Sequence, residues 1–174
     1  ERATASSGPW TEVATPGADA TSYSDTGLTA GTTYWYRVRA YNSGGDSGYS
    51  NTASATTLPS LPVAPSSLTA TAASSSQINL SWADNSNNET GFKIERCLGA
   101  GCTNFAEVAT VRAGVTSYAN TSLTAATTYQ YRVRAYNTGG DSAYSNVSGA
   151  TTLPSIPVTP SSLTANASSS SQIN

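Results

Sequence analysis

The residue types that most often perform chemistry in proteins are scarce in this chain. Among its 174 residues are two Cys, ten acidic and eight basic residues, and no His. The lack of His excludes Ser-His-Asp and Cys-His arrangements as well as His-ligated metal sites. Two Cys are too few for a four-thiolate zinc site. The sequence therefore predicts no catalytic residues, no metal site and no cofactor.

The two cysteines, Cys97 and Cys102, bracket the segment Leu98-Gly99-Ala100-Gly101, which is typical of a hairpin tip. If paired, they would join the two flanking strands and contribute on the order of 2 kcal/mol. A disulfide also indicates an oxidising compartment. A redox-active pair is the alternative, but the spacing is not Cys-x-x-Cys and Arg96 is the one basic neighbour. We therefore predict a structural disulfide.

A second candidate site is a surface row of alternating residues, Trp35, Arg37, Arg39 and Tyr41. Such a row could pack against another module or chain, stack on a sugar ring, or simply cover its own arginines. The matching Arg132 and Arg134 favour a cross-strand charge ladder over an anion- or glycan-binding surface. A net charge of −2 excludes the strongly basic surface that nucleic-acid binding requires.

These arginines belong to a stretch that occurs twice, at Thr32–Asn42 and at Thr127–Asn137, 95 residues apart. In the second copy Tyr129, Tyr131 and Val133 alternate with polar residues. Because side chains on a strand point alternately to opposite faces, this pattern predicts a half-buried β-strand rather than a helix. A period near 95 suits one complete small β-domain and is too long for a solenoid unit.

One whole repeat runs from Val63 to Leu153. Its alternating segments, separated by turn formers, predict an all-β sandwich. The predicted strands are Ser67–Ala72, Gln77–Trp82, Gly91–Cys97, Phe105–Val111, Thr116–Ala119, Thr128–Asn137 and Ser145–Thr152. The predicted core residues are Trp82, Phe92, Ile94, Val108, Tyr118, Leu123, Tyr129, Tyr131 and Val133.

Several segments of this repeat together resemble a known family. They are Pro65-Ser66-Ser67-Leu68, Leu80-Ser81-Trp82, Gly91-Phe92-Lys93-Ile94-Glu95-Arg96, Leu123 six residues before Tyr129, and Tyr131–Asn137. The repeat resembles a fibronectin type III domain of the bacterial extracellular kind. The resemblance implies an immunoglobulin-like β-sandwich in tandem repeats, with Tyr34 and Tyr129 as tyrosine-corner residues whose hydroxyls bond nearby backbone. Ala125-Ala126 departs from the Pro-Gly that the family usually has.

The repeats and two proline-rich segments divide the chain into five parts. Residues 1–58 form the C-terminal part of a repeat, 66–153 a complete repeat, and 161–174 the N-terminal strands of a further one. Residues 59–65 and 154–160 are linkers, in which frequent proline favours extended, semi-rigid structure. Two interpretations of the partial repeats are open. They belong to a window of a longer tandem array, or one chain's tail completes the next chain's head.

The function expected from these features is structural. The chain is predicted to be a non-catalytic spacer, stalk or fibre, secreted or at the cell surface of a bacterium, with neighbouring copies or adjacent repeats as partners and with head-to-tail polymerisation as an option. The alternative is an adhesive module, or a carbohydrate- or protein-binding one, in a secreted adhesin or enzyme, with a cell-surface protein or polysaccharide as partner. No apolar run reaches the length of a membrane span.

Three segments fit the glycosylation pattern, a short motif that also matches by chance; they begin at Asn88, Asn120 and Asn146. The loops Asn42–Ser47 and Asn137–Ser142 lack the Arg-Gly-Asp with which animal relatives bind integrins. Their glycines fit a hairpin that needs positive φ.

Overall fold

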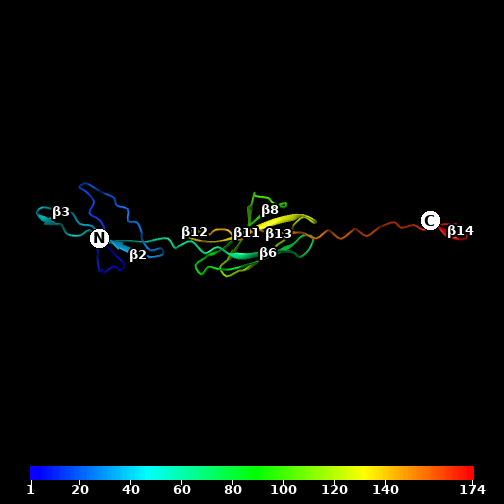
Figure 1. Cartoon of the computed structure of the whole chain (residues 1–174), viewed down its shortest axis with the longest axis horizontal. Helices are drawn as coiled ribbons and strands as arrows, with labels where there is room; N and C mark the ends of the chain where they lie inside the picture. The colour runs from blue at the N-terminus through cyan, green and yellow to red at the C-terminus, as the bar shows by residue number, and fades with distance from the viewer.

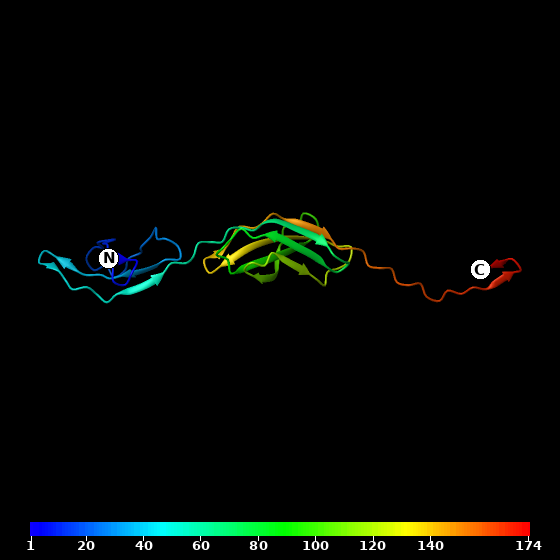
Figure 2. The ribbon, with the colours of Figure 1, turned by 90° about the horizontal axis from the view of Figure 1, so that it is seen from below.

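The computed structural model describes residues 1–174 and contains strands but no helices. Figures 1 and 2, seen from perpendicular directions, show an elongated chain with a small N-terminal unit, a central sandwich and an extended C-terminal tail. The strands of the central sandwich are β6 (Ser66–Ala72), β7 (Ile78–Ala83), β8 (Gly91–Leu98), β9 (Ala106–Arg112), β10 (Ser117–Asn120), β11 (Thr128–Asn137), β12 (Gly140–Asp141) and β13 (Ser148–Thr151).

Two antiparallel sheets form this sandwich. One has the order β10-β7-β6, and the other has the order β9-β8-β11 with β12 and β13 both paired to the far edge of β11. The long register between β11 and β8 runs from Tyr129 opposite Leu98 to Tyr136 opposite Gly91. Gly91 lies against the carbonyl of Val111, so a side chain there would collide with the backbone of β9. The predicted all-β sandwich is confirmed.

The core lies between the sheets and follows the two-residue period of the strands. On β11 buried and half-buried residues alternate from Thr128 to Ala135. Seven of the predicted core residues are buried in it, and Val108 and Tyr118 pack against it partly buried. Four further core residues were not predicted: Leu68, Ile78, Leu80 and Ala135. The first three are isolated aliphatic residues in Ser- and Thr-rich strands, and their side chains close the sandwich from the opposite sheet.

The last predicted strand, Ser145–Thr152, differs from the structure. It begins only at Ser148, and β12 precedes it as a separate two-residue strand. Between them, the hydroxyls of Ser142 and Ser145 accept the N–H groups of Ala135 and Val133 at 2.9 and 3.0 Å. Side-chain oxygens thus take the place of backbone acceptors in the ladder, a competition that residue patterning does not reveal.

The N-terminal unit has one small sheet and a hairpin. Strands β1 (Arg2–Ala3), β2 (Thr33–Tyr36) and β5 (Ala53–Thr56) form the sheet in the order β1-β2-β5, and β3 (Tyr41–Asn42) pairs with β4 (Gly45–Asp46). No second sheet covers this unit, so Val38 is 68% exposed whereas its match in the sandwich, Val133, is fully buried.

The tail beyond the sandwich carries one short hairpin, β14 (Ala167–Ser169) with β15 (Gln172–Ile173). Residues 161–166 are not in a strand, although the matching residues of β6 are. Leu163 is 97% exposed, and its match Leu68 is 3% exposed. The tail therefore has the sequence of the first sandwich strands without the sheet on which those strands pack.

Candidate functional site

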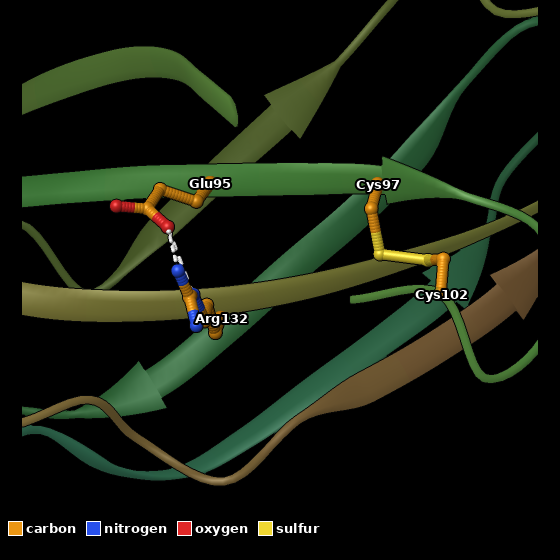
Figure 3. Close-up of a disulfide and its surroundings, with 4 residues drawn as sticks. All are labelled: Glu95, Cys97, Cys102 and Arg132. Atoms are coloured by element: carbon orange, nitrogen blue, oxygen red, sulfur yellow. Dashed lines mark hydrogen bonds and ion pairs between the residues drawn. A yellow bond between two sulfur atoms is a disulfide. The ribbon is translucent and has the colours of Figure 1, made fainter. Parts of the chain in front are cut away.

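The most elaborate polar cluster lies on the outer face of the central sandwich, around Glu95 of β8. This carboxylate is 5% exposed. Arg132 of β11 donates to its Oε2 from Nε and Nη2 at 2.8 and 2.6 Å, and the Tyr144 hydroxyl donates to Oε1 at 2.9 Å. Figure 3 shows the Glu95–Arg132 pair between the two neighbouring strands. The register that places Glu95 opposite Arg132 produces this geometry.

The cluster continues along the sheet as a ladder of ion pairs. Arg134 Nη2 lies 3.2 Å from Glu95 Oε1, and its Nη1 lies 2.9 Å from Asp141 Oδ2. Lys93 Nζ lies 2.8 Å from Asp141 Oδ1. The guanidinium carbon of Arg132 sits 3.6 Å from the centre of the Tyr144 ring and 4.4 Å from that of Phe105. Every charge in this ladder has a partner of opposite sign.

The N-terminal unit repeats the cluster with matched residues. Arg37 Nη2 lies 2.7 Å from Glu1 Oε2, and the Tyr49 hydroxyl donates to Glu1 Oε1 at 2.8 Å. Arg37 is also 3.6 Å from the centre of the Tyr49 ring and 4.4 Å from that of Trp10. Arg39 pairs with Asp46 at 2.7 Å. The same contacts thus recur in a unit that has only part of the sandwich.

Ionisation in these clusters follows from the contacts. The hydrogen bond from Tyr49, with help from Arg37, lowers the pKa of Glu1. The same bond raises the pKa of Tyr49, and burial together with the bond to Glu95 raises the pKa of Tyr144. The contacts therefore favour the charged form of Glu1 and the neutral forms of Tyr49 and Tyr144. The arrangement therefore suits a static ladder and supplies no group poised for proton transfer near neutral pH.

The predicted surface row is divided in the structure. Trp35 lies half-buried on β2, opposite Ala3 and Ser54 of the neighbouring strands. Tyr41 is exposed and belongs to β3, beyond the end of β2. Arg37 and Arg39 are turned to Tyr49 and to their carboxylates. The structure therefore brings the two arginines together with Trp10 and Tyr49 and leaves Trp35 outside that cluster.

The other predicted site residues lie in local structural contacts. Cys97 and Cys102 form a disulfide with their Cα atoms 6.0 Å apart, at the end of β8 (Figure 3). The Tyr129 hydroxyl accepts the N–H of Thr124 at 3.1 Å, and the Tyr34 hydroxyl accepts that of Thr29 at 3.0 Å. These two bonds have the geometry of a tyrosine corner.

The asparagines of the three glycosylation-like segments are all engaged. Asn88 donates to the backbone carbonyl of Ser60 at 3.0 Å, and Asn120 is buried. Asn146 accepts the N–H of Leu68 and donates to its carbonyl, both at 2.9 Å. Asn88 and Asn146 lie at exposed positions, but their amide nitrogens, to which a glycan would be attached, already donate to backbone carbonyls.

Sequence reasoning did not single out Tyr49 and Tyr144, although each completes a cluster. Their signal is present in the sequence, because Tyr-Ser-Asn recurs at Tyr49–Asn51 and Tyr144–Asn146 with the repeat spacing. No group of three His, Cys, Asp or Glu residues is placed to hold a metal ion. The structure also contains no helix with the length and apolar character that crossing a membrane requires.

Residues 63–151, just over half of the chain, match the family described as fibronectin type III domain. The chain belongs to the fibronectin type III family. The chain is similar to the solved FN1-FN3 domains of chicken CNTN1, with 26% identity and a TM-score of 0.58 over 75% of this chain and 46% of that one. Consecutive domains of titin give 25% identity and a TM-score of 0.53 over 71% of this chain and 41% of that one.

A curated relative of this fibronectin type III chain is Exoglucanase B of Cellulomonas fimi. The two are 29% identical in an alignment 164 residues long that covers 80% of this chain and 14% of the enzyme. The chain thus corresponds to a small part of that enzyme's length. The sandwich is a module of a generally non-catalytic kind that also occurs within enzymes, and its disulfide is typical of oxidising, extracellular surroundings.

Proposed function

We propose that this chain is a non-catalytic spacer of a secreted or cell-surface bacterial protein, in which fibronectin type III modules stand end to end. The observation that carries the proposal is the repeated ladder around Glu95 and Glu1. In both repeats it is closed on itself, with each arginine and carboxylate paired. A ladder of this kind stiffens a sheet and leaves no charge free for a substrate.

The end-to-end arrangement in Figures 1 and 2 supports a spacer rather than a clamp, because no second module lies beside the sandwich to form a cleft. Negative-stain imaging of the native protein tests this function. Rods or filaments are expected. Compact particles in which modules fold back on one another would contradict the spacer.

A second candidate is a binding module, and the relationship to an exoglucanase together with the half-buried Trp35 favours it. An indole ring that is partly exposed can stack on a sugar. Co-sedimentation of the chain with an insoluble glucan separates the two functions. A spacer stays in the supernatant. A binder sediments, and Trp35→Ala releases it while Gln130→Ala, at the matched position of the other repeat, does not.

The partners that we propose are adjacent repeats of the same type. Val133, Leu68 and Ile78 share one core in the sandwich, whereas their matches Val38, Leu163 and Ile173 are 68, 97 and 72% exposed. The open face of the first unit therefore fits a strand pair like the one that the tail carries. An adjacent repeat of a longer chain or a second copy would supply it.

Sedimentation velocity over a wide concentration range distinguishes the two sources. Association that grows with concentration and is lost in Val38→Asp indicates a second copy. A chain that stays monomeric at every concentration overturns the second copy and leaves the adjacent repeat as the source.

A further inference from the structure

The linker between the first unit and the sandwich is held from both sides. The carbonyl of Leu58 accepts the N–H of Gly31, in the first unit, at 3.0 Å. The carbonyl of Ser60 accepts the side-chain amides of Asn88 and Asn137, in the sandwich, at 3.0 and 2.8 Å. Only Pro59 lies between the two anchoring residues, and its ring fixes one of the few backbone torsions between them.

The loop that receives the linker is shaped for it. Asn137 Oδ1 accepts the N–H of Gly139 at 2.8 Å, which orients the amide nitrogen toward Ser60. Gly139 lies against the Pro59 carbonyl, so a side chain there would collide with the linker. A Cβ on Gly140 would lie 2.9 Å from Leu61 Cδ2. Figure 1 places β12, at this loop, on the end of the sandwich that the linker enters.

The rest of the linker also packs on the sandwich. Pro62 and Pro65 are buried, and Asn85 donates to the carbonyl of Ala64 at 2.9 Å. In the second linker the matching Pro157 and Pro160 are exposed, and Ile156 is 92% exposed compared with 55% for its match Leu61. The second linker therefore has the same pattern as the first, with Ile156 and Thr159 in place of Leu61 and Ala64, but no loop receives it.

The first unit has the complementary half of such a joint. Its loop contains Asn42, Gly44 and Gly45 at the positions of Asn137, Gly139 and Gly140, and Asn42 Oδ1 accepts the N–H of Gly44 at 2.7 Å. A shallow hollow of about 330 Å³ lies at this loop, lined by Ala40, Tyr41, Asn42, Gly44, Gly45, Asp46 and Ser47. No linker segment lies in it.

We propose that the Asn-Xaa-Gly-Gly loop is a docking site for a Pro-Ser-aliphatic-Pro linker, and that the Asn42–Gly45 loop receives such a segment from a neighbouring repeat. The joint around Ser60 then recurs along an array and fixes each module on the next. Recognition rests on a backbone carbonyl, an asparagine amide and an aliphatic side chain over glycine, so it needs no charge. The proposal rests on the spacer function and adds the stiffness of its joints.

The joint present in this chain is tested by ¹⁵N relaxation on the whole chain. With the linker docked, the first unit and the sandwich share one anisotropic tumbling. Asn137→Ala removes the hydrogen bond to Ser60, and Gly139→Ala displaces Pro59, so each variant is expected to give the two units separate, shorter correlation times. Asn104→Ala and Gly48→Ala are matched controls, because Asn104 makes no side-chain hydrogen bond and Gly48 has open space around it.

The open loop is tested with a peptide of residues 153–160 added to the labelled chain. We expect shifts of the Gly44 and Gly45 amide signals that Asn42→Ala abolishes and Asn51→Ala retains. Absence of these shifts, or equal shifts in Asn42→Ala, overturns docking at the open loop. Independent tumbling of the two units in the unmodified chain overturns the stiff joint. Either result would leave the spacer function in place, with flexible joints between its modules, because imaging and glucan binding test that function separately.

Discussion

Asp25 and Asn120 occupy matched positions in the two repeats, but only in the first repeat is the neighbouring tyrosine hydroxyl hydrogen-bonded. Asp25 Oδ2 lies 2.9 Å from Arg2 Nη1 and accepts the Tyr36 hydroxyl at 3.0 Å. In the sandwich Arg96 donates to Asn120 Oδ1 at 3.2 Å, but the Asn120 amide nitrogen and the Tyr131 hydroxyl are both buried without a hydrogen-bond partner. The sandwich thus leaves two buried donors without an acceptor, which costs stability.

Asn120→Asp should therefore stabilise the sandwich. The new carboxylate pairs with Arg96 and gives the Tyr131 hydroxyl an acceptor, as Asp25 does in the first unit, for a gain of about 1 kcal/mol in the free energy of unfolding. Urea unfolding at neutral pH measures this gain. Asn104→Asp adds the same charge at an exposed site and should leave the midpoint unchanged, whereas a lower midpoint for Asn120→Asp would refute the matched-site comparison.

Ala126 has a φ of 49°, in the left-handed region that disfavours a side chain, and its match in the first repeat is Gly31 with a φ of 63°. Replacing Ala126 by Gly relieves a strain of about 1 kcal/mol, part of which is offset by the greater freedom of glycine in the unfolded chain. The expected result is a small rise in the thermal midpoint. Ala113→Gly, at a position without positive φ, serves as the control and should lower it.

Burial raises the pKa of Tyr131 to about 12, well above the ordinary value. The unfolded chain then loses this proton first, near pH ~10. The contribution of protonated Tyr131 to the free energy of unfolding is therefore complete below pH ~10 and is lost as the pH rises toward 12. The urea midpoint of the unmodified chain should fall over this range, and that of Tyr131→Phe should fall less. A folded-state absorbance titration in which every tyrosine ionises near pH ~10 would contradict this.

At the scale of elements, the hairpin from β8 to β9 is closed by the disulfide. Replacing both Cys97 and Cys102 by Ser should lower the free energy of unfolding by about 2 kcal/mol and leave the fold unchanged. The reason is that the unfolded chain has more conformational entropy without the cross-link. The first repeat has Ala3 and Gly8 at these positions, which shows that the repeat pattern does not demand the bond. Reductant should lower the urea midpoint of the unmodified chain and leave the midpoint of the double variant unchanged. A double variant that cannot fold would contradict the claim that the disulfide only adds stability to a sandwich that folds without it.

The elements show how far residue patterning reaches. The strand Thr128–Asn137 was predicted with the bounds it has, because its alternation is strict and its large residues face one way. Leu68, Ile78 and Leu80 were missed as core residues, since a lone aliphatic side chain among serines and threonines gives a weak pattern until the facing sheet is known.

The predicted surface around Trp35 shows the same limit on the candidate site. Alternation gave the outward direction of Arg37, but its partner Glu1 is 36 residues away and Tyr49 lies beyond the following hairpin. The docking of the linker on Asn88 and Asn137 likewise joins segments 28 and 77 residues apart. Such contacts depend on loop placement, which a period of two does not specify.

At the scale of the whole molecule, the first unit, the sandwich and the tail lie in a line, and the linker between the first unit and the sandwich is short and anchored at both ends. The net charge is low, and the charged side chains of the ladder on the sandwich are paired with one another. The spacer that we propose would contribute distance and direction, and its shape in solution is the property on which that function depends.

Small-angle X-ray scattering of the chain in dilute solution tests this most directly. A compact chain of 174 residues would have a radius of gyration of about 16 Å. For the proposed spacer we expect a value well above that, with the scattering of a thin rod and no change between low and moderate salt. A radius near ~16 Å, produced by modules packed side by side, would contradict it.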